Sequence, residues 1–171
     1  MKLMLLLLVI TNLTGTDLNL YRRLLDKSLN DESAAKQLFN QLKRVDGKDE
    51  PVLLGFRAMS EFMLCKHLLN PISRISHFNK GKGLLEAAIK KDTLNPELLY
   101  FRLSTQSNIP SFLRYKMNIA ADKARLINYL KAGSVQPVKD RELYQRIRSY
   151  LLINPFCSLE EKAMIRNLQY D

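Results

Sequence analysis

The sequence contains few of the residues that form turns and covalent crosslinks: six glycines, six prolines and two cysteines among 171 residues, and no tryptophan. A β-sandwich or barrel needs a turn about every 8–12 residues, so an all-β fold is excluded. Two cysteines also exclude a disulfide-rich scaffold. A chain of this length removes roughly 70% of its unfolded surface from water, so one domain can fold without metal or disulfides.

Long apolar runs are also absent, and the only unbroken run stands at the N-terminus. Lys2 is followed by eight apolar residues, Leu3 to Ile10, and then by a small, polar stretch. A transmembrane helix needs about 20 apolar residues, whereas a charge, a short apolar run and small residues are typical of a secretory signal. We predict a signal peptide at 1–16, a single helical domain at 17–171, and export to the periplasm or the exterior. The alternative is that the run forms the first buried helix of a cytosolic protein.

The two cysteines, Cys65 and Cys157, allow one pairing, which an oxidising compartment would permit. Both have apolar neighbours in the sequence, for example Phe156 beside Cys157. This setting favours buried free thiols over a disulfide.

Between the prolines the apolar residues recur at helical spacing, and we expect a helix boundary at each proline. We expect a polar connection after Asn70, a long helix opened by Pro110, and a left-handed stop at Gly133. Ser158 and Glu161 have the spacing of a capping box. The sequence thus predicts an all-α fold of about eight helices in antiparallel hairpins, without a sheet. The expected helices cover 17–29, 31–42, 51–69, a stretch ending near 92, 96–104, 110–133, 140–152 and a stretch from 158 onward.

One helical hairpin carries a repeat-like motif, Gly81-x-x-x-Leu85-x-x-Ala88-Ile89-x-x-Asp92-x-x-Asn95-Pro96-Glu97. It resembles the second helix of a tetratricopeptide repeat and the start of the next, which implies a tetratricopeptide-like fold. The chain departs from that family at Thr93, where a turn proline is usual, and at Ala58, where an aromatic is expected. The segments from Asn95 to Arg102 and from Pro110 to Lys123 also resemble small exported helical proteins of bacteria without known activity.

Residues suited to catalysis or metal binding are sparse. Cys65 and His67 are two apart, which places them on different faces of a helix, and no metal site is expected. Ser33 and Lys36 match a Ser-x-x-Lys nucleophile pattern without its companion motifs. The run 80–83, Lys-Gly-Lys-Gly, is interpreted as an exposed basic turn, with an anion site at a helix start as the alternative. We therefore predict no catalytic residue, no cofactor and no enzymatic activity.

The positive charge is distributed unevenly. Residues 17–50 hold seven basic and seven acidic groups, whereas residues 98–148 hold ten basic and three acidic groups. The excess is either a solvated surface or a binding face for an anionic partner such as an acidic protein, lipid headgroups or polysaccharide. Nucleic acid is the least favoured partner of an exported protein without a recognition motif. The candidate partner-binding residues are Lys80, Lys82, Arg102, Arg114, Arg141 and Arg148.

These features favour an exported, tetratricopeptide-like protein-binding or scaffold module with a basic face in its second half. Two other classes stay open. One is a small helical enzyme whose site the sequence does not reveal, and the other is a cytosolic nucleic-acid-binding protein.

Overall fold

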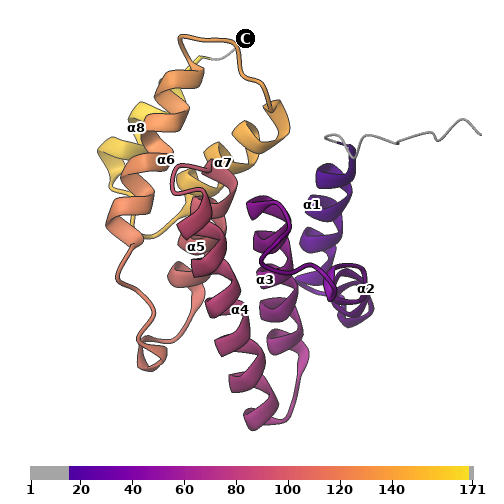
Figure 1. Cartoon of the computed structure of the whole chain (residues 1–171). Helices are drawn as coiled ribbons and strands as arrows, with labels where there is room; N and C mark the ends of the chain where they lie inside the picture. Colours follow the sequence, from indigo (N-terminus) through magenta and orange to yellow (C-terminus); the bar gives the residue numbers. More distant parts are fainter. Residues whose placement is uncertain (1–15, 170–171) are drawn as a thin grey trace, which may run out of the picture.

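The structure, a computed structural model, describes residues 16–169. The predicted signal segment lies outside these residues, except for Thr16. The described part contains eight α-helices, one short 3-10 helix and no strand, which confirms the all-α prediction (Figure 1). The helices are α1 (Thr16–Ser28), α2 (Glu32–Leu42), α3 (Pro51–His67), α4 (Pro71–Lys91), α5 (Pro96–Asn108), η1 (Ser111–Leu113), α6 (Ile119–Gly133), α7 (Arg141–Ile153) and α8 (Leu159–Asn167).

Local side-chain caps explain where several helices begin. The Asp31 carboxylate accepts hydrogen bonds from two free amides at the start of α2, and Asn70 and Asn95 do the same for α4 and α5. A proline at the first helical position follows each asparagine, where its missing N–H costs nothing. Ser158 and Glu161 form the predicted capping box at α8.

The prediction of a polar connection after Asn70 is wrong, because these residues form the first half of α4. Asn70 Oδ1 accepts from the amide of Ile72 at 2.9 Å, and the helix then continues over 21 residues. Residues 71–80 are polar because this half of α4 lies at the surface, with Phe78 as its buried residue. The connection between α3 and α4 is therefore only the three residues 68–70.

The prediction that a long helix begins at Pro110 is wrong, and so is the prediction that Gly133 ends it in a left-handed conformation. Pro110 precedes the 3-10 helix η1, which ends at Arg114 in a left-handed conformation with φ 49°. The α-helix begins only at Ile119. No described glycine has a positive φ. Gly133 instead leaves room for Tyr144, whose Cε2 would lie 2.5 Å from a Cβ at this position.

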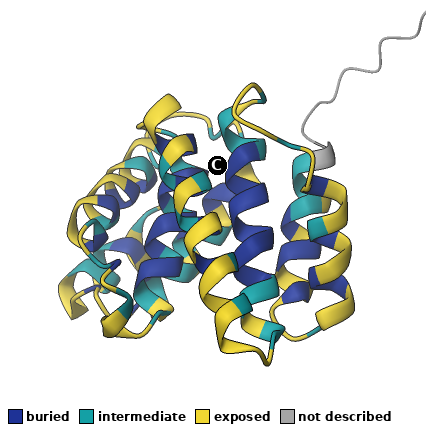
Figure 2. Ribbon diagram, turned by 60° about the horizontal axis from the view of Figure 1, so that its bottom comes forward, coloured by how far each residue is buried: buried dark blue, intermediate teal, exposed yellow. Residues whose placement is uncertain are grey.

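The core is built around α3, in which every residue from Leu54 to Met63 is buried (Figure 2). Helices α1, α2, α4 and α5 contact α3, and small residues make the closest approaches possible. A Cβ on Gly81 would lie 2.9 Å from Phe62 and 3.0 Å from the Ala58 carbonyl oxygen. A second apolar cluster joins α5 to the last three helices, so α5 contributes to both clusters. Within the described range no helix is long and apolar enough to cross a membrane.

Candidate functional site: a groove between α5, α6 and α7

The six basic residues predicted to bind a partner do not form one face. Arg102 is buried, with 6% of its surface exposed, so its assignment to a partner face is corrected. Its guanidinium donates to both carboxylate oxygens of Asp122, at 2.7 and 2.8 Å, and to Glu86 at 2.9 Å. The Arg102 guanidinium is therefore paired inside the protein, where these hydrogen bonds join α5 to α6 and α4.

Three of the other predicted residues lie on or against α4. Lys80 pairs with Glu61 at 3.0 Å, and Lys82 lies 5.0 Å from the centre of the Tyr115 ring. Arg114 is exposed in the connection that carries this tyrosine. The run 80–83 lies inside α4, so it is neither a turn nor a helix start, and its amides are part of a continuous helix. An anion site of the kind found at helix N-termini is therefore excluded there.

The remaining two, Arg141 and Arg148, lie on α7 and differ in their surroundings. Arg141 is exposed at the first turn of the helix, next to Asp140. Arg148 is half-buried, and its guanidinium donates to the Arg166 carbonyl at 2.9 Å, at the end of α8. Arg141 is therefore available to a partner, whereas Arg148 joins α7 to α8 through a hydrogen bond.

The buried carboxylates of the protein are each bound by an arginine. Glu61 is fully buried and also accepts from His77 Nδ1 at 2.5 Å, while Glu97 is 2% exposed. Burial raises the pKa of Glu97, and its Arg22 partner opposes that rise. The pairs are Arg22 with Glu97, Arg57 with Glu61, and Arg102 with Asp122. The first pair joins α1 to α5 and the third joins α5 to α6. The second pair lies within α3, and its Glu61 also binds His77 and Lys80 of α4.

The two cysteines are free, as predicted, with Cys157 buried and Cys65 half-buried. Burial raises the pKa of both thiols, which disfavours the reactive thiolate. Among the described residues no group of three or more His, Cys, Asp or Glu side chains could hold a metal ion.

Two adjoining pockets lie where α5 begins, beside α6 and the connection from α6 to α7. Their volumes are about 230 and about 310 Å³, and both include Pro96 and Tyr129 in their walls. We call them together the α5–α7 groove. Its apolar wall consists mainly of Leu94, Pro96, Leu99, Tyr129, Val138 and Leu143. The size and the lining are those of a site for a few apolar side chains of a ligand.

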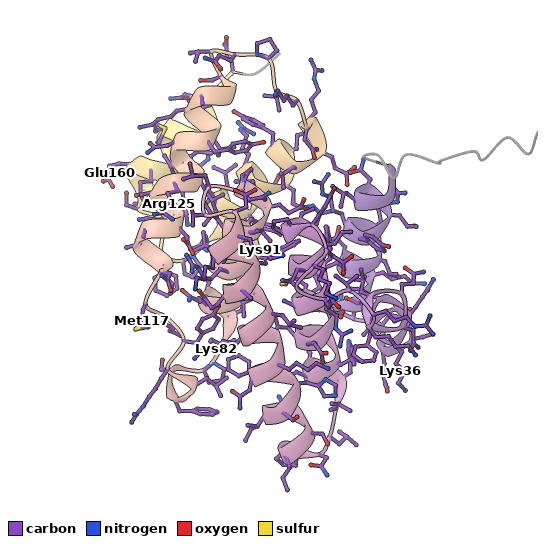
Figure 3. All side chains as sticks on the ribbon, viewed as in Figure 1. Lys36, Lys82, Lys91, Met117, Arg125 and Glu160 are labelled. Atoms are coloured by element: carbon purple, nitrogen blue, oxygen red, sulfur yellow. The ribbon has the colours of Figure 1, made fainter. Side chains whose placement is uncertain are left out.

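The charged residues that line the groove are two cations and one carboxylate. Arg125 and Lys139 line it and are exposed, and Arg125 projects from the surface of α6 (Figure 3). Asp140 also lines the groove, but its two carboxylate oxygens accept from Arg22 at 2.8 and 3.2 Å. Burial raises the pKa of Tyr129, with Asp140 as a second cause, so this phenol stays neutral. The groove therefore combines an apolar wall with unneutralised positive charge.

Sequence reasoning located this region only in part. Arg125 and Lys139 fall within the stretch 98–148, whose excess of basic residues can be recognised from the sequence. Leu94, in the connection before α5, and Pro96, the first residue of α5, are more than forty residues away in sequence from Val138. Only the packing of α5 against α6 brings these residues together. Comparison with models of known families, with curated proteins and with solved structures found no match to this chain.

Proposed function

We propose that this protein is a binding or scaffold module that holds a segment of a partner protein in the α5–α7 groove. The observation that carries this proposal is the pairing of an apolar wall with exposed Arg125 and Lys139 on its rim. The segment that fits best contains apolar side chains next to Asp or Glu. The apolar side chains lose contact with water, and the carboxylates are attracted by the rim cations.

The architecture supports a binding module. Consecutive helices contact one another and α3 and α4 run antiparallel, and helical hairpins of this kind present grooves to peptides or partner helices (Figure 1). The tetratricopeptide-like motif begins in α4, where Gly81, Leu85 and Ala88 are buried, and ends in the first turn of α5. The short 68–70 connection is also closer to the compact hairpins of that family than the sequence suggested. This part of the argument is an analogy of fold.

Export remains part of the proposal, and it rests on the apolar run and the small residues of 1–16. The partner is then a protein of the cell envelope or the exterior. Mass spectrometry of the protein purified from its native cells tests this directly. A mature N-terminus near Asp17 is expected, and an intact N-terminus at Met1 or Lys2 contradicts export.

The groove is tested by selecting displayed random peptides on the purified protein and measuring their affinity by fluorescence anisotropy. Selected peptides are expected to be enriched in Asp or Glu together with Leu, Ile or Phe. Charge reversal on the rim, Arg125→Glu with Lys139→Glu, is expected to weaken them by about tenfold or more. This loss corresponds to about 1.4 kcal/mol, which is within the range for two rim charges.

The matched control reverses two exposed cations outside the groove, Arg23→Glu with Lys43→Glu. Its net charge equals that of the rim variant, so it separates a local effect from a global one. Peptides that bind both variants equally well, or that show no enrichment in acidic residues, contradict the groove as the site. Failure to select any peptide also counts against the proposal.

A further inference from the structure

Two chain segments that approach each other at one end of the molecule contain no acidic residue. Residues 62–85 contain four Lys or Arg and no Asp or Glu, and residues 98–121 contain three and none. The first segment includes the turn between α3 and α4, and the second includes the connection between α5 and α6. Tyr115 joins the two, because its ring packs edge-on against Phe78 with centroids 6.2 Å apart and carries Lys82 above it.

The same end carries the most exposed apolar side chain of the described protein. Leu69 is 95% exposed at the α3–α4 turn, and Ile72 is 80% and Ile75 is 53% exposed on the first turns of α4. We call these three residues the α3–α4 tip. Phe112 and Met117, in the α5–α6 connection, are 77% and 89% exposed. Burying such side chains is normally favourable, so a cluster of them at one end indicates a contact surface.

The tip projects from the molecule and is not part of a cavity. The α3–α4 hairpin extends beyond the other helices at the lower end of the molecule (Figure 1). On the same side, Met117 and Lys82 lie at the surface above it (Figure 3). Neither pocket of the α5–α7 groove includes a residue of the α3–α4 tip or of the connection between α5 and α6. A projecting apolar tip suits a soft surface that it can enter, whereas a rigid partner would need a matching hollow.

The acidic residues that border this end do not cancel its charge. Glu61 is fully buried beneath His77 and Lys80, and it also binds Arg57. Glu86 accepts from Arg102 at 2.9 Å and from the Tyr115 hydroxyl at 2.6 Å. Glu61 is buried and Glu86 is 39% exposed, and both carboxylates already have partners within the protein. The exposed residues Arg74 and Arg114 have no carboxylate among their described contacts.

We propose that the α3–α4 tip and the α5–α6 connection dock the protein on a lipid surface that carries anionic headgroups. The apolar side chains would enter the boundary between headgroups and acyl chains, while Arg74, Arg114 and Lys116 lie among the phosphates. Nucleic acid would account for the cations but would leave Leu69 and Ile72 in water, and a rigid protein partner would need a hollow that receives them. This surface is distinct from the α5–α7 groove, and the inference goes beyond the protein-binding function proposed above.

Vesicle flotation with the full chain tests the proposal. The wild-type protein is expected to float with vesicles in which about one third of the lipid is phosphatidylglycerol, and much less with pure phosphatidylcholine. Raising the salt from about 0.05 to about 0.5 M weakens this binding. Each Lys or Arg near such a surface contributes about fivefold in affinity, so Arg74→Glu with Arg114→Glu is expected to lower binding by more than about tenfold.

The apolar contribution is tested with Leu69→Ser and Ile72→Ser in one variant. The matched control is Leu159→Ser with Ile153→Ser, which removes one leucine and one isoleucine of 79% and 77% exposure from the α7–α8 region. The tip variant is expected to lose about tenfold or more in vesicle affinity, and the control variant to keep the wild-type value within about twofold. Equal urea midpoints for all variants establish that the fold is unchanged, because every substituted side chain is exposed.

Three results would overturn the proposal. The first is equal binding of the wild type to neutral and anionic vesicles. The second is a tip variant that floats as well as the wild type. Lipid binding would then belong to another part of the chain, such as residues 1–16, which all variants share. The third is that no form of the protein binds vesicles, while substitution of the tip abolishes binding to a protein partner. A defect in peptide binding with normal flotation would bear only on the α5–α7 groove.

Discussion

Replacing Arg22 with methionine is expected to be among the most destabilising single changes in this protein. The side chains of Arg22 and its partner Glu97 are 2% and 3% exposed. The guanidinium makes five hydrogen bonds, two to Glu97, two to Asp140 and one to Asn19. It therefore joins α1 to the start of α5 and to the N-cap of α7, which are 75 and 118 residues away in the sequence.

The expected size of the effect follows from what Arg22→Met leaves behind. Glu97 becomes a buried carboxylate without a cation, and breaking a buried pair in this way costs about 3–5 kcal/mol. Asp140 is 39% exposed and can be hydrated, so it adds less. For a protein of this size, each kcal/mol lowers the melting temperature by about 2–4 °C, which gives a decrease of about 6–20 °C.

Urea denaturation followed by circular dichroism measures the change, and a double-mutant cycle isolates the pair. Arg22→Met with Glu97→Met replaces both charges by apolar side chains. The double variant is expected to lie within about 2 kcal/mol of the wild type, because no buried charge is left unpaired. If the double variant is as unstable as the sum of the two single variants, or if Arg22→Met costs less than about 1 kcal/mol, the ion pair does not hold these helices as described.

The pH dependence gives a second, independent check. Burial already raises the pKa of Glu97, and loss of the opposing Arg22 raises it further. A carboxyl group with a raised folded-state pKa is stabilising at low pH, and this stability is lost as the pH rises from about 4.5 through the folded-state value. The penalty of Arg22→Met is therefore expected to be smaller at pH 5 than at pH 8. A penalty independent of pH would show that Glu97 is not the group left unpaired.

Three further predictions concern helix packing, acid stability and capping. Gly83→Ala is expected to stabilise the protein by about 0.5–1 kcal/mol, because nothing lies within 4 Å of the added Cβ. Gly133→Ala is expected to destabilise it by about 1–3 kcal/mol, because the added Cβ would contact the Tyr144 ring. Urea midpoints equal to that of the wild type would contradict both predictions. Burial opposes ionisation of Glu61, but hydrogen bonds from His77 and two other basic side chains outweigh it and lower the pKa. Its contribution is thus complete above about pH 4.5 and is lost as the pH falls through the lowered pKa, so Glu61→Gln should be less stable at pH 7 yet show a shallower loss of stability in acid titration. Ser158→Ala removes the cap of α8 and is expected to cost about 0.5–2 kcal/mol in thermal melts; an unchanged melting temperature would argue against the capping box.

The sequence by itself determined the class of fold and many helix boundaries. Apolar spacing depends on the helical period, and caps such as Asp31 and Ser158 act within three residues of their own position, so both can be recognised without knowledge of the fold. The same local reasoning failed for residues 71–80, where a surface helix with one buried side chain shows too little apolar periodicity to be recognised.

Tertiary structure alone decided which charged residues are available to a partner. In the sequence Arg102 and Arg141 are both basic residues of a basic stretch, yet one is buried against Asp122 and the other is exposed. The α5–α7 groove likewise takes Leu94 and Val138 from distant parts of the chain. Composition gives the sign and amount of charge, but burial and ion pairing depend on contacts between helices far apart in the sequence, and only the packed fold specifies those contacts.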